Sequence, residues 1–231
     1  MANQVQILLF ASKGVCPEGQ SSRRAVGNLS KEQQDRLWDA LYLRRTDIDD
    51  ILDHVRDTAT KGYIYPLFVM APHTGARRSE MIRSQRIDFD FDNEVVTIRE
   101  KNRVHGTMTT RRVPTSPLLA STMQDWFTRH PNSIHTFSPD PFQTDQPDHS
   151  REPITKDQAH NHFKQTLAKS KWKKIRGWHC FRHSFISNLA CEGVDQRIID
   201  EFVGHTTEQM RRRYRHLFPN VKKEALLRVF G

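Results

Sequence analysis

Apolar side chains recur at helical spacing over several stretches of the chain. In the clearest stretch, a helix that starts at 46–49 has apolar residues at i, i+3, i+4 and i+7, namely Ile48, Ile51, Leu52 and Val55. Residues 63–70 are almost wholly apolar and predict a buried helix, with Pro66 in the first turn, where its missing N–H does no harm. Spacing and capping motifs predict further helices at 30–41, 118–128, 155–167, 181–191, 196–203, 208–217 and 221–230.

The pattern changes from helical to alternating after residue 83. Ile87–Phe91 alternates and leads into a turn signal, and Val95–Arg99 and Thr109–Pro114 are typical of strands joined by a loop at 101–108. Residues 131–153, rich in Pro and Asp, predict a long loop. The sequence therefore predicts an α+β fold, mainly α, with a small antiparallel sheet between two sets of helices.

Charge is distributed unevenly along the 231 residues. The first 150 residues hold 19 basic and 19 acidic side chains, and residues 151–231 hold 17 basic and 8 acidic ones, so the whole net charge of +9 lies in the last third. A basic segment of this kind favours a polyanion partner such as nucleic acid, the alternative being a solvated basic face. The three cysteines form no CxxC pair, which indicates a reducing compartment and argues against structural zinc. No apolar run reaches the ~18 residues that a membrane helix needs.

Four separate clusters suit one kind of chemistry. They are Thr74–Glu80, Lys101, His179–Arg182, and Gly204-His205 followed nine residues later by Tyr214. Paired arginines can neutralise the nonbridging oxygens of a phosphodiester without a metal, because each guanidinium donates two parallel hydrogen bonds. A tyrosine hydroxyl can attack phosphorus, and a lysine can protonate the leaving oxygen. Each cluster alone has a structural alternative, such as a surface ion pair between Arg and Glu.

In this order, the clusters resemble the tyrosine recombinase, or phage integrase, family. A TGxRxxE motif falls on Thr74–Glu80, HxxRH on His179–His183, a near-match to LGH on Val203–His205, and the terminal nucleophile on Tyr214. The resemblance spans residues 29–230 and implies the catalytic fold of that family, with the small sheet near the active site. Two apolar replacements depart from the family pattern: Val203 and Phe181 stand where leucine is usual.

The resemblance also implies a role for each site residue. Two arginines would clamp the scissile phosphate, two histidines would assist them, a lysine would be the general acid, and a tyrosine would form a 3′-phosphotyrosine bond. The implied catalytic residues are Arg77, Lys101, His179, Arg182, His205 and Tyr214, with Glu80 in support. Contacts to double-stranded DNA are expected from Lys171, Lys173, Lys174, Arg176, Arg211, Arg212 and Arg213. No metal and no cofactor is expected.

The implied function is site-specific, metal-independent DNA recombination or integration, as in a mobile element, by a cytoplasmic, nucleoid-associated enzyme. Alternatives are a DNA-binding relic or fragment, and a type IB topoisomerase or telomere resolvase. Residues 1–28 are too few for the separate core-binding domain of the family and are expected to be a lead-in to a catalytic domain at 29–231. The free chain is expected to be a monomer that joins a synaptic tetramer. The apolar tail helix Val221–Phe230 would then dock on a neighbour or fold back on its own core.

Overall fold

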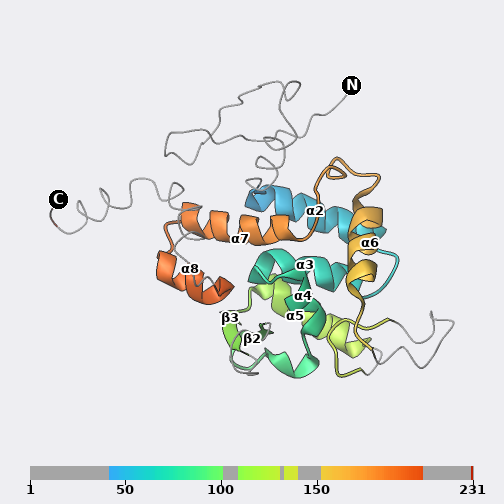
Figure 1. The fold of residues 1–231 in the computed structure, drawn as a ribbon, viewed down its shortest axis with the longest axis horizontal. Helices are drawn as coiled ribbons and strands as arrows, with labels where there is room; N and C mark the ends of the chain where they lie inside the picture. Colours follow the sequence, from blue (N-terminus) through green and yellow to red (C-terminus); the bar gives the residue numbers. More distant parts are fainter. Residues whose placement is uncertain (1–41, 101–108, 131–132, 140–151, 205–229, 231) are drawn as a thin grey trace, which may run out of the picture.

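The computed structural model describes residues 42–100, 109–130, 133–139, 152–204 and 230 (Figure 1). Within these ranges the predicted α+β fold, mainly helical, is confirmed. The elements in chain order are α2 (Arg45–Thr58), α3 (Ile64–Thr74), α4 (Arg78–Arg83), the 3₁₀ helix η1 (Arg86–Asp88), β1 (Phe89–Asp90), β2 (Val95–Arg99), β3 (Thr110–Pro114), α5 (Pro117–Thr128), α6 (Lys156–Leu167), α7 (His179–Cys191) and α8 (Gln196–Val203).

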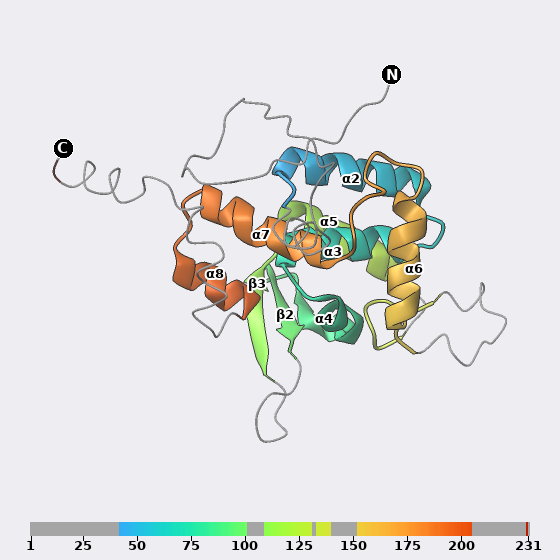
Figure 2. The ribbon, with the colours of Figure 1, turned by 45° about the horizontal axis from the view of Figure 1, so that its top comes forward.

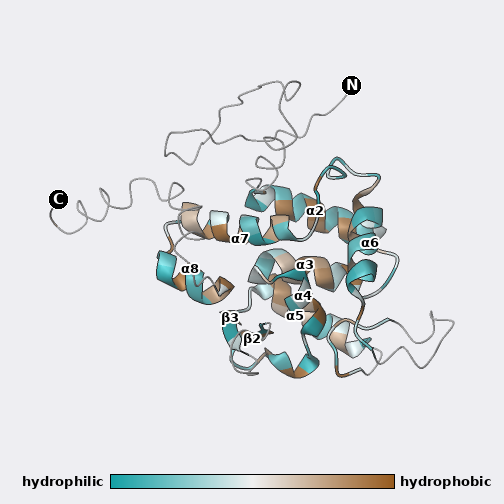
Figure 3. Cartoon of the chain, in the orientation of Figure 1, coloured by the Kyte–Doolittle hydropathy of each residue, from teal (hydrophilic) through white to brown (hydrophobic). Residues whose placement is uncertain are grey.

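Helix α3 lies at the centre of the core, where it packs against α2, α5 and α7 (Figures 1 and 2). Nearly all of its side chains are buried, as its apolar sequence predicts, and in Figure 3 it is largely brown, whereas α2 and α6 show both colours. An aromatic cluster of Phe68, Phe163, Trp178 and Phe181 joins α3 to α6 and to the start of α7, with ring centroids 4.7 to 6.2 Å apart. This cluster fixes the position of α7, which carries His179.

The helix ends follow local hydrogen bonds. The predicted apolar face of α2 is confirmed, but the helix starts at Arg45, one residue before the predicted start. The reason is that Arg44 is the N-cap residue, and its amide donates to Asp47 at 3.1 Å. At α6 the predicted capping box is confirmed: Thr155 Oγ1 accepts from the Gln158 amide, and Gln158 Oε1 accepts from the Thr155 amide. Helix α7 starts at His179, two residues before the predicted start.

The three strands form an antiparallel sheet in the order β1-β2-β3. Strands β2 and β3 lie where the alternation predicts them, with Val96 opposite Val113 and Ile98 opposite Arg111. The alternation at 87–91 is misleading, since residues 86–88 form a 3₁₀ turn and Ile87 is 82% exposed. The cause is Asp88, which caps that turn by accepting from the Gln85 amide and is held there by Arg99.

The predicted loop at 131–153 is ordered in its described part. The Thr136 amide donates to the Ser84 carbonyl at 2.9 Å, and Trp126 Nε1 donates to the Thr136 carbonyl at 2.8 Å. Phe137 is fully buried, and its carbonyl accepts from the Ile154 amide. Residues 136–138 therefore belong to the core rather than to a surface loop, whereas Ile134 is 67% exposed.

The expected helices at 30–41 and 208–217 and the tail at 221–229 lie outside the described residues. Phe230 is described, and its side chain is 82% exposed. Among the described helices, none is both long and apolar enough to cross a bilayer.

Candidate active site

A glycine turn between α3 and α4 places Arg77. Gly75 ends α3 with a left-handed backbone, φ 62°, and a Cβ there would lie 2.6 Å from the Phe185 ring, so the position requires glycine. Thr74 Oγ1 donates to the Met70 carbonyl and accepts from the Ala76 amide, which fixes the turn. The Thr-Gly pair of the motif therefore forms the turn that places Arg77 as the N-cap residue of α4.

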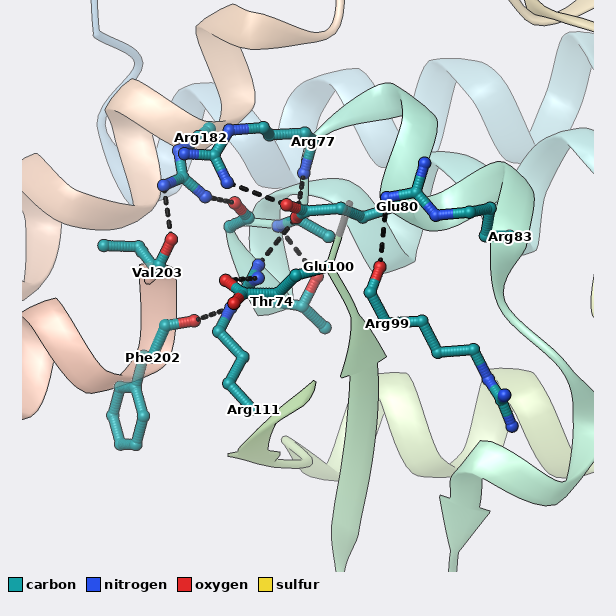
Figure 4. Close-up of polar contacts among 12 residues, drawn as sticks. Thr74, Arg77, Glu80, Arg83, Arg99, Glu100, Arg111, Arg182, Phe202 and Val203 are labelled. Atoms are coloured by element: carbon teal, nitrogen blue, oxygen red, sulfur yellow. Dashed lines mark hydrogen bonds and ion pairs between the residues drawn. The ribbon is translucent and has the colours of Figure 1, made fainter. Parts of the chain in front are cut away.

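Glu80 joins two arginines beneath the start of α4. Its carboxylate accepts from the Arg77 amide at 2.8 Å, from Arg77 Nη1 at 2.7 Å and from Arg111 Nη2 at 2.7 Å, and the residue is 2% exposed (Figure 4). Burial alone would raise the Glu80 pKa, but the hydrogen bonds and charge of Arg111 and Arg77 outweigh it and lower the pKa to about 2. Glu80 is therefore an anion that holds Arg77 in one orientation.

Arg111 is a buried cation that the sequence motifs do not reveal. Besides Glu80 it binds Glu100, with Nη1 to Oε1 at 3.0 Å, and it donates from Nε to the Phe202 carbonyl at 2.6 Å (Figure 4). The sequence signal is its place in β3, because Arg111 alternates with exposed neighbours and shares the buried face with Val113. A charged side chain in a core-facing strand position predicts a buried ionic partner.

Arg182 lies behind this cluster and is 2% exposed. Its Nη1 donates to the Gly75 carbonyl at 2.7 Å and its Nη2 to the Val203 carbonyl at 2.5 Å (Figure 4). The guanidinium thus links the end of α3, where Arg77 follows, to the end of α8, where His205 follows. On the same helix, the His179 and His183 rings meet edge-on, with centroids 4.4 Å apart.

A cleft of about 530 Å³ opens between the start of α4, helix α6 and the start of α7. Arg77 and His179 line it together, although they are far apart in the sequence. The other charged or titratable residues of its described lining are Arg78, Lys156, Arg176, His160, His183 and Cys180, and none of them is a carboxylate. Positive groups on every side, without an acidic side chain among them, suit a phosphate anion.

The predicted site residues are only partly described. Arg77, Glu80 and Arg182 lie close together in Figure 4, whereas Lys101, His205, Tyr214 and Arg211–Arg213 fall outside the described residues. The residues just before Lys101 and His205, Glu100 and Gly204, are described.

The basic link at 169–176 divides into two groups. Among the residues expected to contact DNA, Arg176 lines the cleft. Lys171 instead pairs with Asp50 at 2.6 Å, and Lys173 and Lys174 are exposed in the turns before α7, outside the cleft lining. DNA contact by these three lysines stays a prediction.

Neither a metal cluster nor a reactive thiol stands out in the described part of the cleft. No group of three or more His, Cys, Asp or Glu side chains in the described ranges is arranged to hold a metal ion. Burial raises the pKa of the Cys180 thiol to about 12, so this cysteine is a poor nucleophile.

The chain was compared with known protein families and with curated proteins. The sequence model of the phage integrase family matches residues 42–220. The chain is similar to the tyrosine recombinase XerD of Rickettsia conorii, at 46% identity over 50 residues that make up 22% of this chain and 16% of the relative. It is also similar to the tyrosine recombinase XerC of Chlamydia caviae, at 25% identity over 152 residues, 66% of this chain and 46% of the relative. The chain thus spans less than half of the length of these two curated relatives.

Solved structures share the fold at low sequence identity. The XerA recombinase matches 83% of this chain and 65% of its own with a TM-score of 0.63 and 16% identity. The Tn1549 transposon integrase, solved in complex with circular intermediate DNA, matches 82% and 67% with a TM-score of 0.65 and 17% identity. The catalytic domain of bacteriophage HP1 integrase matches 80% of this chain and 93% of that domain, with a TM-score of 0.57 and 20% identity. With the family match covering most of its length, the chain belongs to the phage integrase family.

Proposed function

We propose that this chain is the catalytic part of a site-specific recombinase that breaks and rejoins double-stranded DNA through a 3′-phosphotyrosine intermediate. The observation that carries the proposal is the cleft, where Arg77 and His179 meet among positive side chains while Arg182 lies buried behind the turn that presents Arg77. Arg77 and His179 in one cleft, with the Arg182 cation buried behind them, fit a phosphodiester in its transition state, because charge grows on the nonbridging oxygens.

The bond changes follow from these groups. The Tyr214 hydroxyl gives its proton to His179 as its oxygen attacks phosphorus. The bond from phosphorus to the 5′ oxygen breaks, and the 5′ oxygen takes a proton from the Lys101 ammonium. The phosphotyrosine ester keeps the energy of the broken bond, so attack by a 5′ hydroxyl on that ester rejoins the strand and releases the tyrosine. His179 and His205 donate hydrogen bonds to the phosphate in the transition state.

The surroundings of the cleft support an interface with the DNA backbone. Arg78, Lys156 and Arg176 line it beside Arg77, and we infer that all three contact phosphates next to the scissile one. We infer that Lys171, Lys173, Lys174 and Arg211–Arg213 extend this interface, since the whole excess charge of the chain lies beyond residue 150.

The decisive experiment is covalent trapping. Duplexes nicked close to the cleavage position lose the short strand that would be rejoined, so the wild-type chain accumulates a protein–DNA adduct on a denaturing gel. Tyr214→Phe removes one hydroxyl and should abolish the adduct while DNA binding persists. Tyr65→Phe is the matched control, because the Tyr65 hydroxyl accepts from Arg56, outside the cleft lining. An adduct that persists in Tyr214→Phe would contradict the proposal, as would DNA binding without any adduct in the wild type.

Assembly on DNA is a second part of the proposal. We infer that the chain is a monomer when free and joins other protomers in a tetramer on paired sites, with the tail helix 221–230 docked on a neighbour. Phe230 supports this view, because its large apolar side chain is 82% exposed. Deletion of residues 221–231 should lower assembly on paired sites more than binding to a single site. Normal assembly with a lower melting temperature would show instead that the tail packs on its own core.

A further inference from the structure

The Arg111 guanidinium uses its three nitrogens on three different elements. Nη2 binds Glu80 in α4, Nε binds the Phe202 carbonyl in α8, and Nη1 binds Glu100 at the end of β2 (Figure 4). The Arg111 side chain is 5% exposed, so these contacts are made away from water. None of the three nitrogens points to the cleft, whose described lining does not include Arg111.

One of these partners, Glu100, directly precedes Lys101 in the chain, and another, Phe202, lies three residues before His205. Glu100 and Gly204 are thus the last described residues before Lys101 and His205. The two described ends also meet in space. A Cβ on Gly204, whose φ is 64°, would lie 2.1 Å from Glu100 Oε1, which shows that the Glu100 carboxylate rests directly on Gly204.

Glu100 also closes the base of the loop that bears Lys101. Its amide donates to the Thr109 carbonyl at 2.8 Å, and its Oε2 accepts from Thr109 Oγ1 at 2.8 Å. Arg111 holds Oε1 of the same carboxylate, so both oxygens are fixed from opposite sides. Glu100, the residue before Lys101, is therefore held in place by Arg111 and Thr109 together.

We propose that Arg111 is a positioning residue for the general acid, which fixes the base of the 101–108 loop against the end of α8 and so directs Lys101 to the leaving 5′ oxygen. The inference rests on the proposed function, because it takes Lys101 as the proton donor. It also requires an arginine, since a lysine keeps the charge but offers one nitrogen where three are used.

A substrate that needs no proton tests this role. When sulfur replaces the 5′ bridging oxygen, the bond from phosphorus to sulfur breaks and a thiolate leaves unprotonated, because a thiol has a pKa of about 8.5. Arg111→Lys should slow single-turnover cleavage of ordinary DNA at least about 100-fold, as for the loss of a general acid. It should slow cleavage of the sulfur substrate less than about tenfold, with DNA affinity unchanged. Arg112→Lys, on the exposed face of the same strand, should cleave both substrates at the wild-type rate.

Equal slowing of both substrates by Arg111→Lys would overturn the proposal, because the defect would then lie in the phosphate clamp or in folding. A change of less than tenfold on ordinary DNA would overturn it as well. If Arg111→Lys does not fold, Glu100→Gln takes its place, since it weakens the same contact and leaves the Arg111–Glu80 pair intact. The same rescue by sulfur is expected, and its absence counts against the proposal.

A measurement that does not depend on DNA cleavage separates this proposal from the proposed function. Hydrogen exchange at the amides of Glu100 and Gly204 should be at least about tenfold faster in Arg111→Lys than in Arg112→Lys, because both amides lie at the segment ends that Arg111 holds. Unchanged exchange would overturn the positioning role even if the wild-type chain cleaves DNA. A wild-type chain that forms no adduct would count against the proposed function alone.

Discussion

Substitution of Glu80 by glutamine tests whether the carboxylate that holds Arg77 and Arg111 stabilises the fold. The ordinary pKa of 4.5 falls to about 2 in the folded chain, a difference that corresponds to about 3 kcal/mol in favour of the ionised form. Glutamine keeps an accepting oxygen but removes the charge, and it leaves the Arg111 side chain, 5% exposed, with Glu100 as its remaining carboxylate. We therefore expect Glu80→Gln to lower the free energy of unfolding by about 3 kcal/mol at pH 7.

The pH dependence gives this prediction its sign. Because the Glu80 pKa is lower in the folded than in the unfolded chain, its stabilisation is fully present above about pH 4.5 and is lost as the pH falls toward 2. Urea unfolding followed by tryptophan fluorescence should show two stability curves that converge between about pH 5 and pH 2. Asp53→Asn, at an exposed pair with Arg56, should cost less than about 1 kcal/mol. Parallel wild-type and Glu80→Gln curves over that range would refute the reasoning.

Three further predictions concern the turn, the cations and the thiol. Gly75→Ala should lower the free energy of unfolding by about 2 kcal/mol, measured as a lower melting temperature, because alanine is strained at φ 62° and its Cβ would displace the Phe185 ring. Gly177→Ala is the control and should be nearly neutral, because there is open space around Gly177. Neutralising Lys156 and Arg176 in the cleft should weaken DNA binding. It should also reduce the slope of log affinity against log salt concentration by about 0.9 per lost phosphate contact. If Lys171, Lys173 and Lys174 contact DNA, neutralising them should reduce affinity and slope by similar amounts, and a smaller loss means that they do not. Peptide mapping after iodoacetamide treatment at pH 8 should leave Cys180 unmodified in the native chain, because desolvation raises the pKa of this half-buried thiol to about 12. Rapid modification there would contradict this.

Elements set by local patterns could be predicted from the sequence. The apolar face of α2 and the capping box of α6 depend on residues three to seven positions apart, and both are found where the spacing places them. The alternation at 87–91 failed, because one ion pair between Asp88 and Arg99, eleven positions away, favours a 3₁₀ turn over a longer strand. A period of two cannot report such a contact.

The candidate site divides along the same line. Arg77 and His179 could be named from their motifs, since each motif encodes its own turn or helix start. The role of Arg111 could not, because its partners Glu80 and Phe202 lie 31 and 91 positions away and belong to separate elements. The motifs also could not show that Arg176 lines the cleft while Lys171 pairs with Asp50.

The burial of Arg182 has a consequence for how such a protein can decay. Its guanidinium donates to the carbonyl of Gly75, the C-cap residue of α3, and to the carbonyl of Val203, the last residue of α8. The helix dipole gives the C-terminal end of each helix about half a negative charge. Arg182 therefore also stabilises the fold, and its loss would remove the hydrogen bonds that hold both helix ends together. Arg77, whose side chain is 26% exposed, can be lost at a smaller cost to folding. A descendant released from selection for catalysis, but still selected to fold, would lose Arg77 and retain Arg182. Under the proposed function, the order in which these two arginines disappear among diverging copies would thus show which copies lost catalysis before they lost the fold.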